Sequence, residues 1–339
     1  MIMISLADLA KHCNVSVATV SKALNDQNDV SVSTKERIRK AADEMGYFPN
    51  AAARSLKTNH TNNLGVLFVD EASSGLTHEY FSAVLEGFKK QSESEGYGIT
   101  FINDKVGNRK MTYYEHCIYR NVDGVVIACV DFENPEVIEL MNSTVPVVTI
   151  DYIHNNCSSV LSDNIKGMND LLNYVYDCGH RRIAFIHGQS SSFVSRTRVT
   201  AFYRFMQEHH LPVPEGYDRE ADYLDTKRAA EVTREMLQME NQPTCILYPD
   251  DLAVIGGINV IEELDYHIPD DISVCGYDGT RISQMLKPKL TTIKQDTDTI
   301  GRETAKKLIQ TIENPKTTFI EQRVIPGSLI TGESVRRIK

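Results

Sequence analysis

The sequence predicts a small helical domain at the N-terminus followed by a large α/β core, and three observations support this. Residues 4–49 contain three short stretches with the apolar spacing of helices. After residue 63, apolar runs typical of buried strands alternate with amphipathic helices, and the alternation begins again after residue 164. Such strands separated by helices indicate parallel sheets covered on both faces. The chain of 339 residues is too long for one ordinary domain.

Two short helices joined by a tight turn open the chain. Ser5 is placed to cap the first helix, with Asp8 three residues later as its capping-box partner. Asn14 tolerates the left-handed backbone that a tight turn requires, and Ser16 caps the second helix. The apolar faces consist of Leu6, Leu9 and Ala10 in the first helix and of Val20, Ala23 and Leu24 in the second.

The outer face of the second helix carries small or polar side chains and one cation, which suits the major groove of DNA. The alternative is a helical hairpin whose polar face meets only water. In the DNA-binding interpretation, Val17 and Ala18 make apolar contacts and Lys22 donates to guanine. The expected phosphate contacts are Ser16, Thr19, Ser21, Asn25, Ser31 and Thr34.

A third helix and a conditional fourth complete the N-terminal region. The segment 33–36 has the pattern of a capping box, which predicts the start of the third helix, and Gly46 is expected to end that helix. The alanine run after Pro49 favours another helix, but only about eight residues are available for it. A helix of that length is marginal in water, so we expect it to form only when something holds it.

These motifs resemble the lac repressor/galactose repressor family of bacterial transcription regulators. The residues that carry the match are 6–10, 15–21, Asn25, 46–47 and 49–56. The resemblance implies a helix-turn-helix head over 1–49 and, over 50–60, a hinge helix in the minor groove with a short linker. It also implies that Leu56 opens the central base step, as apolar wedges do in minor-groove sites. The DNA-binding surface is further expected to include Ser5, Leu6, Tyr47, Asn50 and Ala53.

The core sequence predicts two series of alternating strands and helices. Strands are expected over 64–70, 97–103, 124–130, 145–151, 182–188, 244–248 and 272–278, and helices over 80–95, 165–178, 198–209, 226–239 and 252–264. The family resemblance continues through 122–126, 145–147, 163–164, 179–186, 268–278 and 290–296. It implies a core over 61–339, similar to periplasmic binding proteins, with two doubly wound halves joined by three crossings. The first half would comprise about 61–162 and 294–323, and the second about 163–293 and 324–339.

Polar residues that follow the strands are the candidate effector-binding residues, because ligands of open α/β sheets lie beyond the carboxyl ends of the strands. Asp151, Asp250 and Asp278 follow three strands, and Arg198 lies after the strand that ends near 188. By the resemblance, the residues matching Arg198 and Asp278 hold a small effector. A guanidinium and a carboxylate suit the adjacent hydroxyls of a sugar. For each aspartate, the alternative is a helix cap just after a strand.

Two aromatic residues, Tyr80 and Phe81, could offer a flat face to a ring, although Phe81 fits the apolar core equally well. A sugar or sugar phosphate is therefore the expected effector, with a purine or another metabolite as the alternative. A sugar-processing enzyme is a less favoured interpretation. The glycine-rich phosphate loops and the Gly-x-Ser-x-Gly elbow are missing from the sequence, and the histidines lack metal-site spacing. No cofactor or metal is expected.

Charge and composition bear on partners and compartment. Residues 1–60 hold eight basic and six acidic residues, whereas the whole chain has a net charge of −10. Because one head has a net charge of only +2, we expect a homodimer on a pseudo-palindromic operator. The seven cysteines form no Cys-x-x-Cys pair, no run of about 18 apolar residues occurs, and the N-terminal residues lead us to expect no export signal. A cytoplasmic, repressor-like regulator without a membrane span is expected.

Overall fold

The computed structural model describes residues 4–48, 60–69 and 75–338, which belong to two compact units, Met1–Thr61 and Asn62–Lys339. We call the described part of the first unit the head and that of the second the core. The predicted hinge helix and the expected DNA contacts of Asn50, Ala53 and Leu56 lie outside the described residues.

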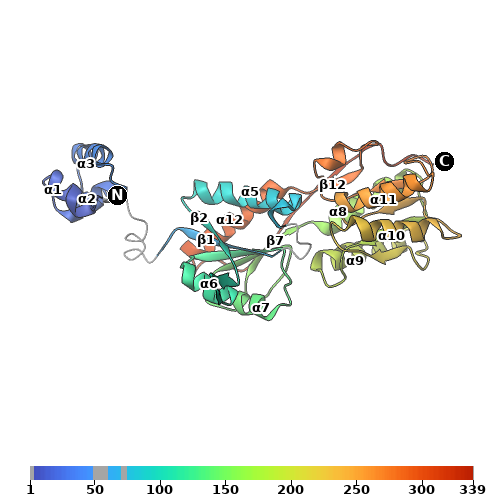
Figure 1. Ribbon diagram of the computed structural model, residues 1–339, viewed down its shortest axis with the longest axis horizontal. Coiled ribbons are helices and arrows are strands. Elements are labelled where there is room, and N and C mark those ends of the chain that lie inside the picture. The colour runs from blue at the N-terminus through green and yellow to red at the C-terminus, as the bar shows by residue number, and fades with distance from the viewer. Residues whose placement is uncertain (1–3, 49–59, 70–74, 339) are drawn as a thin grey trace. The chain divides into compact units, whose positions relative to one another are not determined.

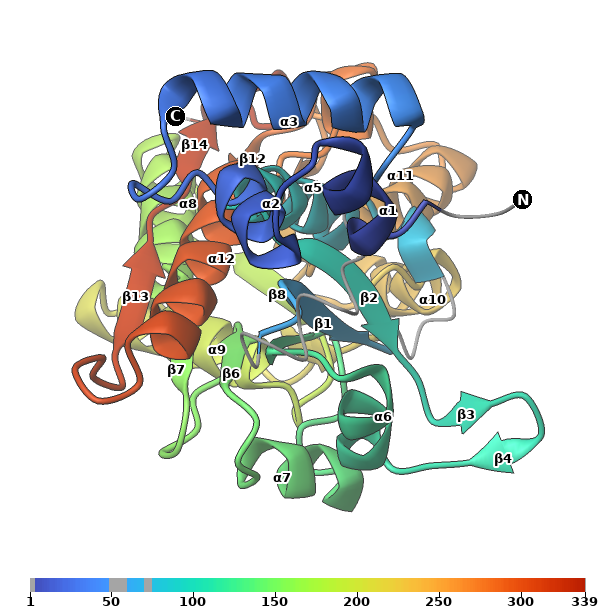
Figure 2. The ribbon, with the colours of Figure 1, turned by 90° about the vertical axis from the view of Figure 1, so that its left-hand side faces the viewer.

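The head contains the three helices α1 (Leu6–His12), α2 (Val17–Leu24) and α3 (Val32–Met45) (Figures 1 and 2). Leu9, Val20 and Ile38 are completely buried where the three helices meet. Asn14 has the predicted left-handed backbone, with φ 51°. Gly46, with φ 66°, ends α3 in the same conformation. These elements agree with the prediction of a three-helix domain.

The helix caps of the head agree with the prediction at α1 and α2 but not at α3. Ser5 and Asp8 form the complete capping box, and the hydroxyl of Ser16 accepts from the amide of Thr19. The third helix begins at Val32, and its cap is Ser31, whose hydroxyl accepts from the amide of Thr34 at 3.3 Å. The capping box predicted over 33–36 is therefore wrong, because residue 33 already lies inside the first turn.

The first half of the core is a six-stranded parallel sheet in the order β13-β7-β6-β5-β1-β2. The strands are β1 (Asn63–Phe68), β2 (Gly98–Ile102), β5 (Gly124–Ala128), β6 (Val147–Ile150), β7 (Ser158–Ser162) and β13 (Gln322–Ile325). Helices α5 (Glu79–Ser94) and α12 (Thr297–Glu313) pack on one face, and α6 (Tyr113–Arg120) and α7 (Pro135–Met141) on the other. The turn η1 (Gly75–Thr77) precedes α5, and the hairpin β3 (Lys105–Val106) and β4 (Arg109–Lys110) follows β2.

The second half has a four-stranded parallel sheet in the order β11-β10-β8-β9. Its strands are β8 (Ile183–His187), β9 (Asp218–Glu220), β10 (Cys245–Leu247) and β11 (Ser273–Cys275). Helices α8 (Asn164–Asp177) and α9 (Phe193–Glu208) cover one face, and α10 (Thr226–Leu237) and α11 (Asp251–Glu263) cover the other. The short η2 (Ile282–Gln284) lies beside α11. Two doubly wound halves are thus confirmed.

Three passages connect the halves: from β7 to α8, from β12 (Thr292–Lys294) to α12, and from β13 to β14 (Ser328–Ile330). The strands β12 and β14 pair antiparallel beside the second half. The predicted boundary near 323 falls inside β13, which pairs with β7 as far as Ile325. Helix α9 begins at Phe193, five residues before the predicted start, so Arg198 lies within its second turn.

Candidate functional site

The outer face of α2 is exposed, as a surface that enters a groove must be. The side chain of Val17 is 46% exposed, and Ala18, Lys22 and Asn25 are also exposed, whereas Ser21 is half-buried. Val20 and Ala23 on the opposite face are fully buried against α1 and α3. The helix therefore presents the predicted set of small and polar side chains to its surroundings.

Most of the hydroxyls assigned to phosphate contacts already serve local structure. The Ser16 and Thr19 hydroxyls are 2.8 Å apart, as are those of Ser31 and Thr34, and each serine caps its helix. Asn25 donates to the carbonyl of Ser21 at 2.7 Å. A serine that caps a helix lies beside free backbone N–H groups, which also attract phosphate. Capping and phosphate binding are therefore compatible at these positions.

Three other expected DNA contacts occupy different environments. Ser5 is exposed and hydrogen-bonded to Asp8, with 2.6 Å between its hydroxyl and the carboxylate. Leu6 and Tyr47 are half-buried and pack against the core of the head. Sequence reasoning missed Asp29, which forms an ion pair with Lys22. Its position in a loop gave no periodic signal.

In the core, Arg198 is the centre of a buried polar cluster. Its side chain is only 4% exposed, and its guanidinium lies 3.5 Å above the ring centre of Tyr277. The Nε donates to Asn164 at 2.7 Å, and Nη1 donates to the carbonyl of Pro249 at 2.8 Å. The Nη2 is 3.9 Å from Oδ1 of Asp278, too far for a direct hydrogen bond. The predicted pair is therefore adjacent and oriented by other contacts.

Asp278 connects Arg198 to the first half of the core through Gln295. The amide of Gln295 donates to Oδ1 of Asp278 at 2.6 Å, and the amide oxygen of Gln295 accepts from the Ser162 hydroxyl. Burial raises the pKa of Asp278, although Arg198 and Gln295 act in the opposite direction. Asp278 also has a left-handed backbone, with φ 99°. The loop after β11 is therefore held in an uncommon conformation beside the crossing strand.

Asp151 lies at the same boundary on the first-half side. Its carboxylate accepts from the hydroxyl of Tyr80 at 2.7 Å and from the amide of Ser162 at 2.7 Å. Burial raises the pKa of Asp151, against these hydrogen bonds and the charge of Arg198. We call Tyr80, Asp151, Ser162, Arg198, Asp278 and Gln295 the interhalf cluster. It brings together four predicted residues, and sequence reasoning missed Ser162 and Gln295, as well as Asn164 and Tyr277.

Two predicted effector-binding residues have other roles in this structure. Both carboxylate oxygens of Asp250 accept backbone N–H groups, from Leu252 and Ala253 at the start of α11 and from Leu224. This is the helix-cap alternative for Asp250. Phe81 is half-buried, and its ring packs 5.6 Å from that of Phe68 and 4.9 Å from that of Tyr80. It belongs to the apolar face of α5, which packs against the core of the first half.

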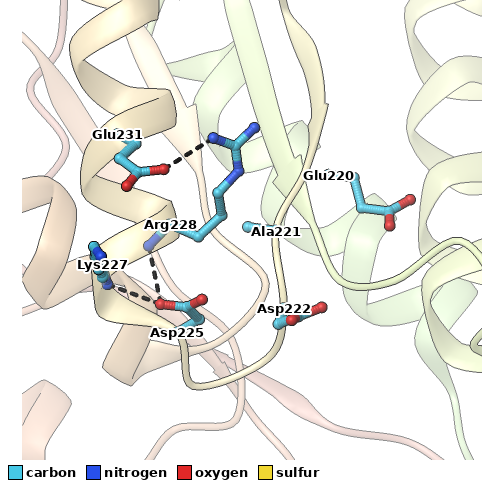
Figure 3. Close-up of a pocket in the computed structure, with 7 residues that line it drawn as sticks. All are labelled: Glu220, Ala221, Asp222, Asp225, Lys227, Arg228 and Glu231. Carbon is cyan, nitrogen blue, oxygen red and sulfur yellow. Dashed lines mark hydrogen bonds and ion pairs between the residues drawn. The ribbon is translucent and has the colours of Figure 1, made fainter.

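A surface hollow of about 510 Å³ lies elsewhere, between the end of β9 and the start of α10 (Figure 3). Glu220, Ala221, Asp222, Asp225, Lys227, Arg228 and Glu231 line it. Arg228 pairs with Glu231, and Asp225 caps α10 by accepting two backbone N–H groups. This hollow has no aromatic lining residue and includes no member of the interhalf cluster.

Three further features concern metal ligands, membrane-crossing helices and cysteines. Across residues 4–48, 60–69 and 75–338, no three histidine, cysteine or carboxylate side chains gather as a metal site requires. In the same residues, no helix has both the length and the apolar character needed to cross a membrane. All seven cysteines are free thiols, six of them buried.

Comparisons with known proteins agree with both regions. Residues 5–50 match the family described as bacterial regulatory proteins, lacI family, and residues 172–335 match the periplasmic binding protein-like domain. The chain is 28% identical over 339 residues to the probable HTH-type transcriptional repressor ExuR of Bacillus subtilis (strain 168), covering 99% of each chain. It is also 28% identical to the HTH-type transcriptional repressor PurR of Vibrio parahaemolyticus, over 92% of this chain and 93% of that one.

The fold is similar to the lac repressor dimer bound to operator and the anti-inducer ONPF. The TM-score is 0.82 and the identity 24%, over 99% of this chain and 100% of the other. The head, the two-halved core and these relatives favour a transcriptional regulator over the enzyme interpretation. The chain therefore combines a DNA-binding domain of the lacI family of bacterial regulatory proteins with a periplasmic binding protein-like core, which is the architecture of a DNA-binding transcriptional regulator.

Proposed function

We propose that this protein is a homodimeric repressor that binds a pseudo-palindromic operator and is switched by a small effector in its core. Repression is supported by the curated relatives, which are named as repressors. A dimer is supported by the small, weakly basic head, since paired helix-turn-helix units bind the two halves of a symmetric site. The bacterial cytoplasm, where the chromosome lies, is the proposed location.

The exposed face of α2 supports a proposal for base reading. Val17 and Ala18 contact base edges by apolar surface, and Lys22 donates to guanine. The caps Ser16 and Ser31, with Ser5, Thr19, Ser21, Asn25 and Thr34, contact phosphates and set the register. Leu6 and Tyr47 then act mainly by holding the head together. For Asn50, Ala53 and Leu56, the minor-groove role is proposed from sequence alone.

Operator binding by Lys22→Ala tests the base-reading role. The variant should lose about 1–3 kcal/mol of binding free energy on the operator and much less on random DNA. An equal loss on both would mean that Lys22 contacts phosphate only. Light scattering after size-exclusion chromatography tests the dimer, and a monomer both with and without operator would contradict the proposal.

For the effector, the buried guanidinium of Arg198 is the single observation that carries the proposal. Burying a cation is costly unless it is paired, and here Asn164, Pro249 and the Tyr277 ring hold it beside Asp278. The gap of 3.9 Å between Nη2 and Asp278 leaves a donor and an acceptor edge that two neighbouring ligand hydroxyls can bridge. A sugar or sugar phosphate fits this chemistry, and a purine or another metabolite is the alternative class.

The contacts between the halves support a closing motion as the switch. In one such contact the amide of Gln295 donates to Asp278 at 2.6 Å, and in another the carboxylate of Glu79 accepts from the amide of Arg281 at 2.8 Å. A ligand at the interhalf cluster would favour one arrangement of the halves only by its differential affinity. Typical couplings of about 1–3 kcal/mol correspond to roughly 5–150-fold changes in operator affinity.

A thermal-shift panel of sugars, sugar phosphates and purines tests the effector proposal. A true ligand at 100 times its Kd should stabilise the core by about 2.7 kcal/mol. Arg198→Ala and Asp278→Ala should each abolish this shift while leaving operator binding intact. The matched control is Arg196→Ala, since Arg196 is exposed on the same helix and its guanidinium donates to the backbone carbonyl of Ser191. Full response in both cluster variants would place the site elsewhere.

A further inference from the structure

The exposed face of α2 contains one ion pair that local structure does not require. Lys22 is the only lysine or arginine within Val17–Leu24, and its ammonium is hydrogen-bonded to the carboxylate of Asp29. Asp29 comes from the loop between α2 and α3 and reaches back to the α2 face. The two side chains are 45% and 51% exposed. Both groups are therefore open to a partner that approaches this face.

The stability of the head does not explain the pair, because exposed ion pairs contribute little to folding. A second carboxylate of the same loop shows the contrast. Asp26 pairs with Lys35 at 3.0 Å and Arg39 at 3.1 Å, both on α3, and so it braces the loop against that helix. Asp29 instead places a negative charge beside the only cation of α2, on a surface that must approach phosphates. Hydrogen bonding to Lys22 lowers the pKa of Asp29, so it remains ionised at neutral pH.

The major-groove edge of a G·C pair has the complementary pattern. Guanine presents the acceptors N7 and O6, and cytosine presents the N4 amino donor. The O6 and N4 atoms are hydrogen-bonded to each other, about 3 Å apart. An ammonium in contact with a carboxylate likewise presents a donor and an acceptor at neighbouring positions. In an A·T pair, the N6 amino group takes the place of O6 and would oppose the ammonium.

We propose that Lys22 and Asp29 read one G·C pair as a unit, with Lys22 donating to guanine and Asp29 accepting from cytosine N4. This inference rests on the proposed placement of α2 in the major groove. It makes Asp29 a specificity-determining residue, because its negative charge would accept a hydrogen bond from cytosine. The ion pair also orients both side chains before DNA arrives.

Selection of duplex DNA from a random library by the full-length protein tests the proposal. The wild type should enrich a motif with one G·C pair at a fixed position of each half-site. Asp29→Ala should lower the preference for that pair roughly tenfold. Asp29→Asn keeps an acceptor oxygen and should retain part of the preference. Lys22→Ala combined with Asp29→Ala should lose little more than either change alone. Asp26→Asn is the matched control and should keep the full motif.

A modified base then tests the cytosine contact directly. N4-methylcytosine places a methyl group where the accepting carboxylate would lie, so at this position it should weaken wild-type binding roughly tenfold and leave Asp29→Ala unchanged. The same base placed in the flanking DNA is the control.

The possible outcomes separate the two proposals. If Asp29→Ala and Asp29→Asn raised affinity equally for selected and random DNA, Asp29 would only repel phosphates and the inference would be wrong. The proposed function would still stand in that case. If the wild type enriched no motif, the proposed base reading by α2 would itself be wrong, and with it the inference that rests on it.

Discussion

The head and the core place their candidate functional residues in opposite environments. On α2 these residues are exposed, and their hydrogen bonds join neighbours a few positions apart, as between Ser16 and Thr19. In the core, Arg198 and Asp278 are buried and belong to a chain of contacts that joins residues over 100 positions apart, such as Ser162 and Gln295. The head can therefore change its binding face without unfolding, whereas changes at the interhalf cluster alter binding and stability together.

The largest expected effect tests whether the head folds independently of the core. Leu9 is completely buried in a cluster of only eight buried residues. Leu9→Ala should cost about 2–5 kcal/mol, which a domain of this size can hardly withstand. We expect operator binding to disappear while the unfolding transition of the core, followed by calorimetry, stays unchanged. Val17→Ala, an exposed control on α2, should leave the stability of the head intact. A parallel shift of the core transition in Leu9→Ala would contradict the two-unit description.

The second prediction concerns a buried carboxylate beside the interhalf cluster. Asp251 accepts from the amide and hydroxyl of Thr280 and from the hydroxyl of Thr292, at 2.6–2.9 Å. It thus ties the loop that carries Asp278 to the crossing strand β12. Burial, and then the charge of Asp278, raises the pKa of Asp251 to about 8.

The sign of its pH dependence follows from this pKa. An unfolded aspartate loses its proton near pH 4, whereas the folded one keeps it to about pH 8. Between these values the unfolded state binds fewer protons, so the free energy of unfolding falls as pH rises, by up to about 1.4 kcal/mol per unit. Asp251→Asn should flatten this slope between pH 6.5 and 8. This range lies above the pKa of Asp250, which burial raises to about 6, so that Asp250 contributes little to the slope there. Urea unfolding at several pH values measures it, with the exposed Asp271→Asn as control. An unchanged slope would show that Asp251 is ionised throughout.

A glycine comparison gives a smaller effect. A Cβ at Gly46 would meet no atom within 4 Å, so Gly46→Ala costs only the strain of φ 66°, about 1 kcal/mol. In the core, a Cβ on Gly256 of α11 would lie 1.8 Å from the Thr226 carbonyl, so α10 and α11 must separate. We expect Gly256→Ala to cost about 1–3 kcal/mol or more by overpacking. If thermal unfolding showed equal destabilisation by Gly46→Ala and Gly256→Ala, α10 and α11 would adjust to the added Cβ without extra cost.

The same contrast explains how far the sequence allowed prediction. Apolar periodicity located the three helices of the head and the principal strands of the core because burial repeats along the chain. Asp151, Arg198 and Asp278 were predicted from the ends of strands and from the family resemblance, and the structure brings them to one boundary. Their role in binding an effector stays a prediction.

The remaining contacts depend on tertiary structure. Gln295 and Ser162 meet only because β7 and the β12–α12 passage lie side by side, and nothing local in the sequence indicates that contact. Asp29 pairs with Lys22 across a loop without a periodic pattern. The start of α9 was misplaced because residues 193–197 are polar and β-branched for the most part, although Ser192 caps the helix.

The smallest expected effect concerns the corrected cap of α3. Ser31 accepts from the amide of Thr34, so Ser31→Ala should destabilise the head by about 1 kcal/mol. Ser33→Ala, the change that the capping-box interpretation would have made costly, should cost less than about 0.5 kcal/mol because Ser33 lies exposed in the first turn. Urea unfolding of the head, followed by its helical signal, compares the two variants. If Ser33→Ala proved the more damaging change, α3 would begin two residues later in solution than in this structure.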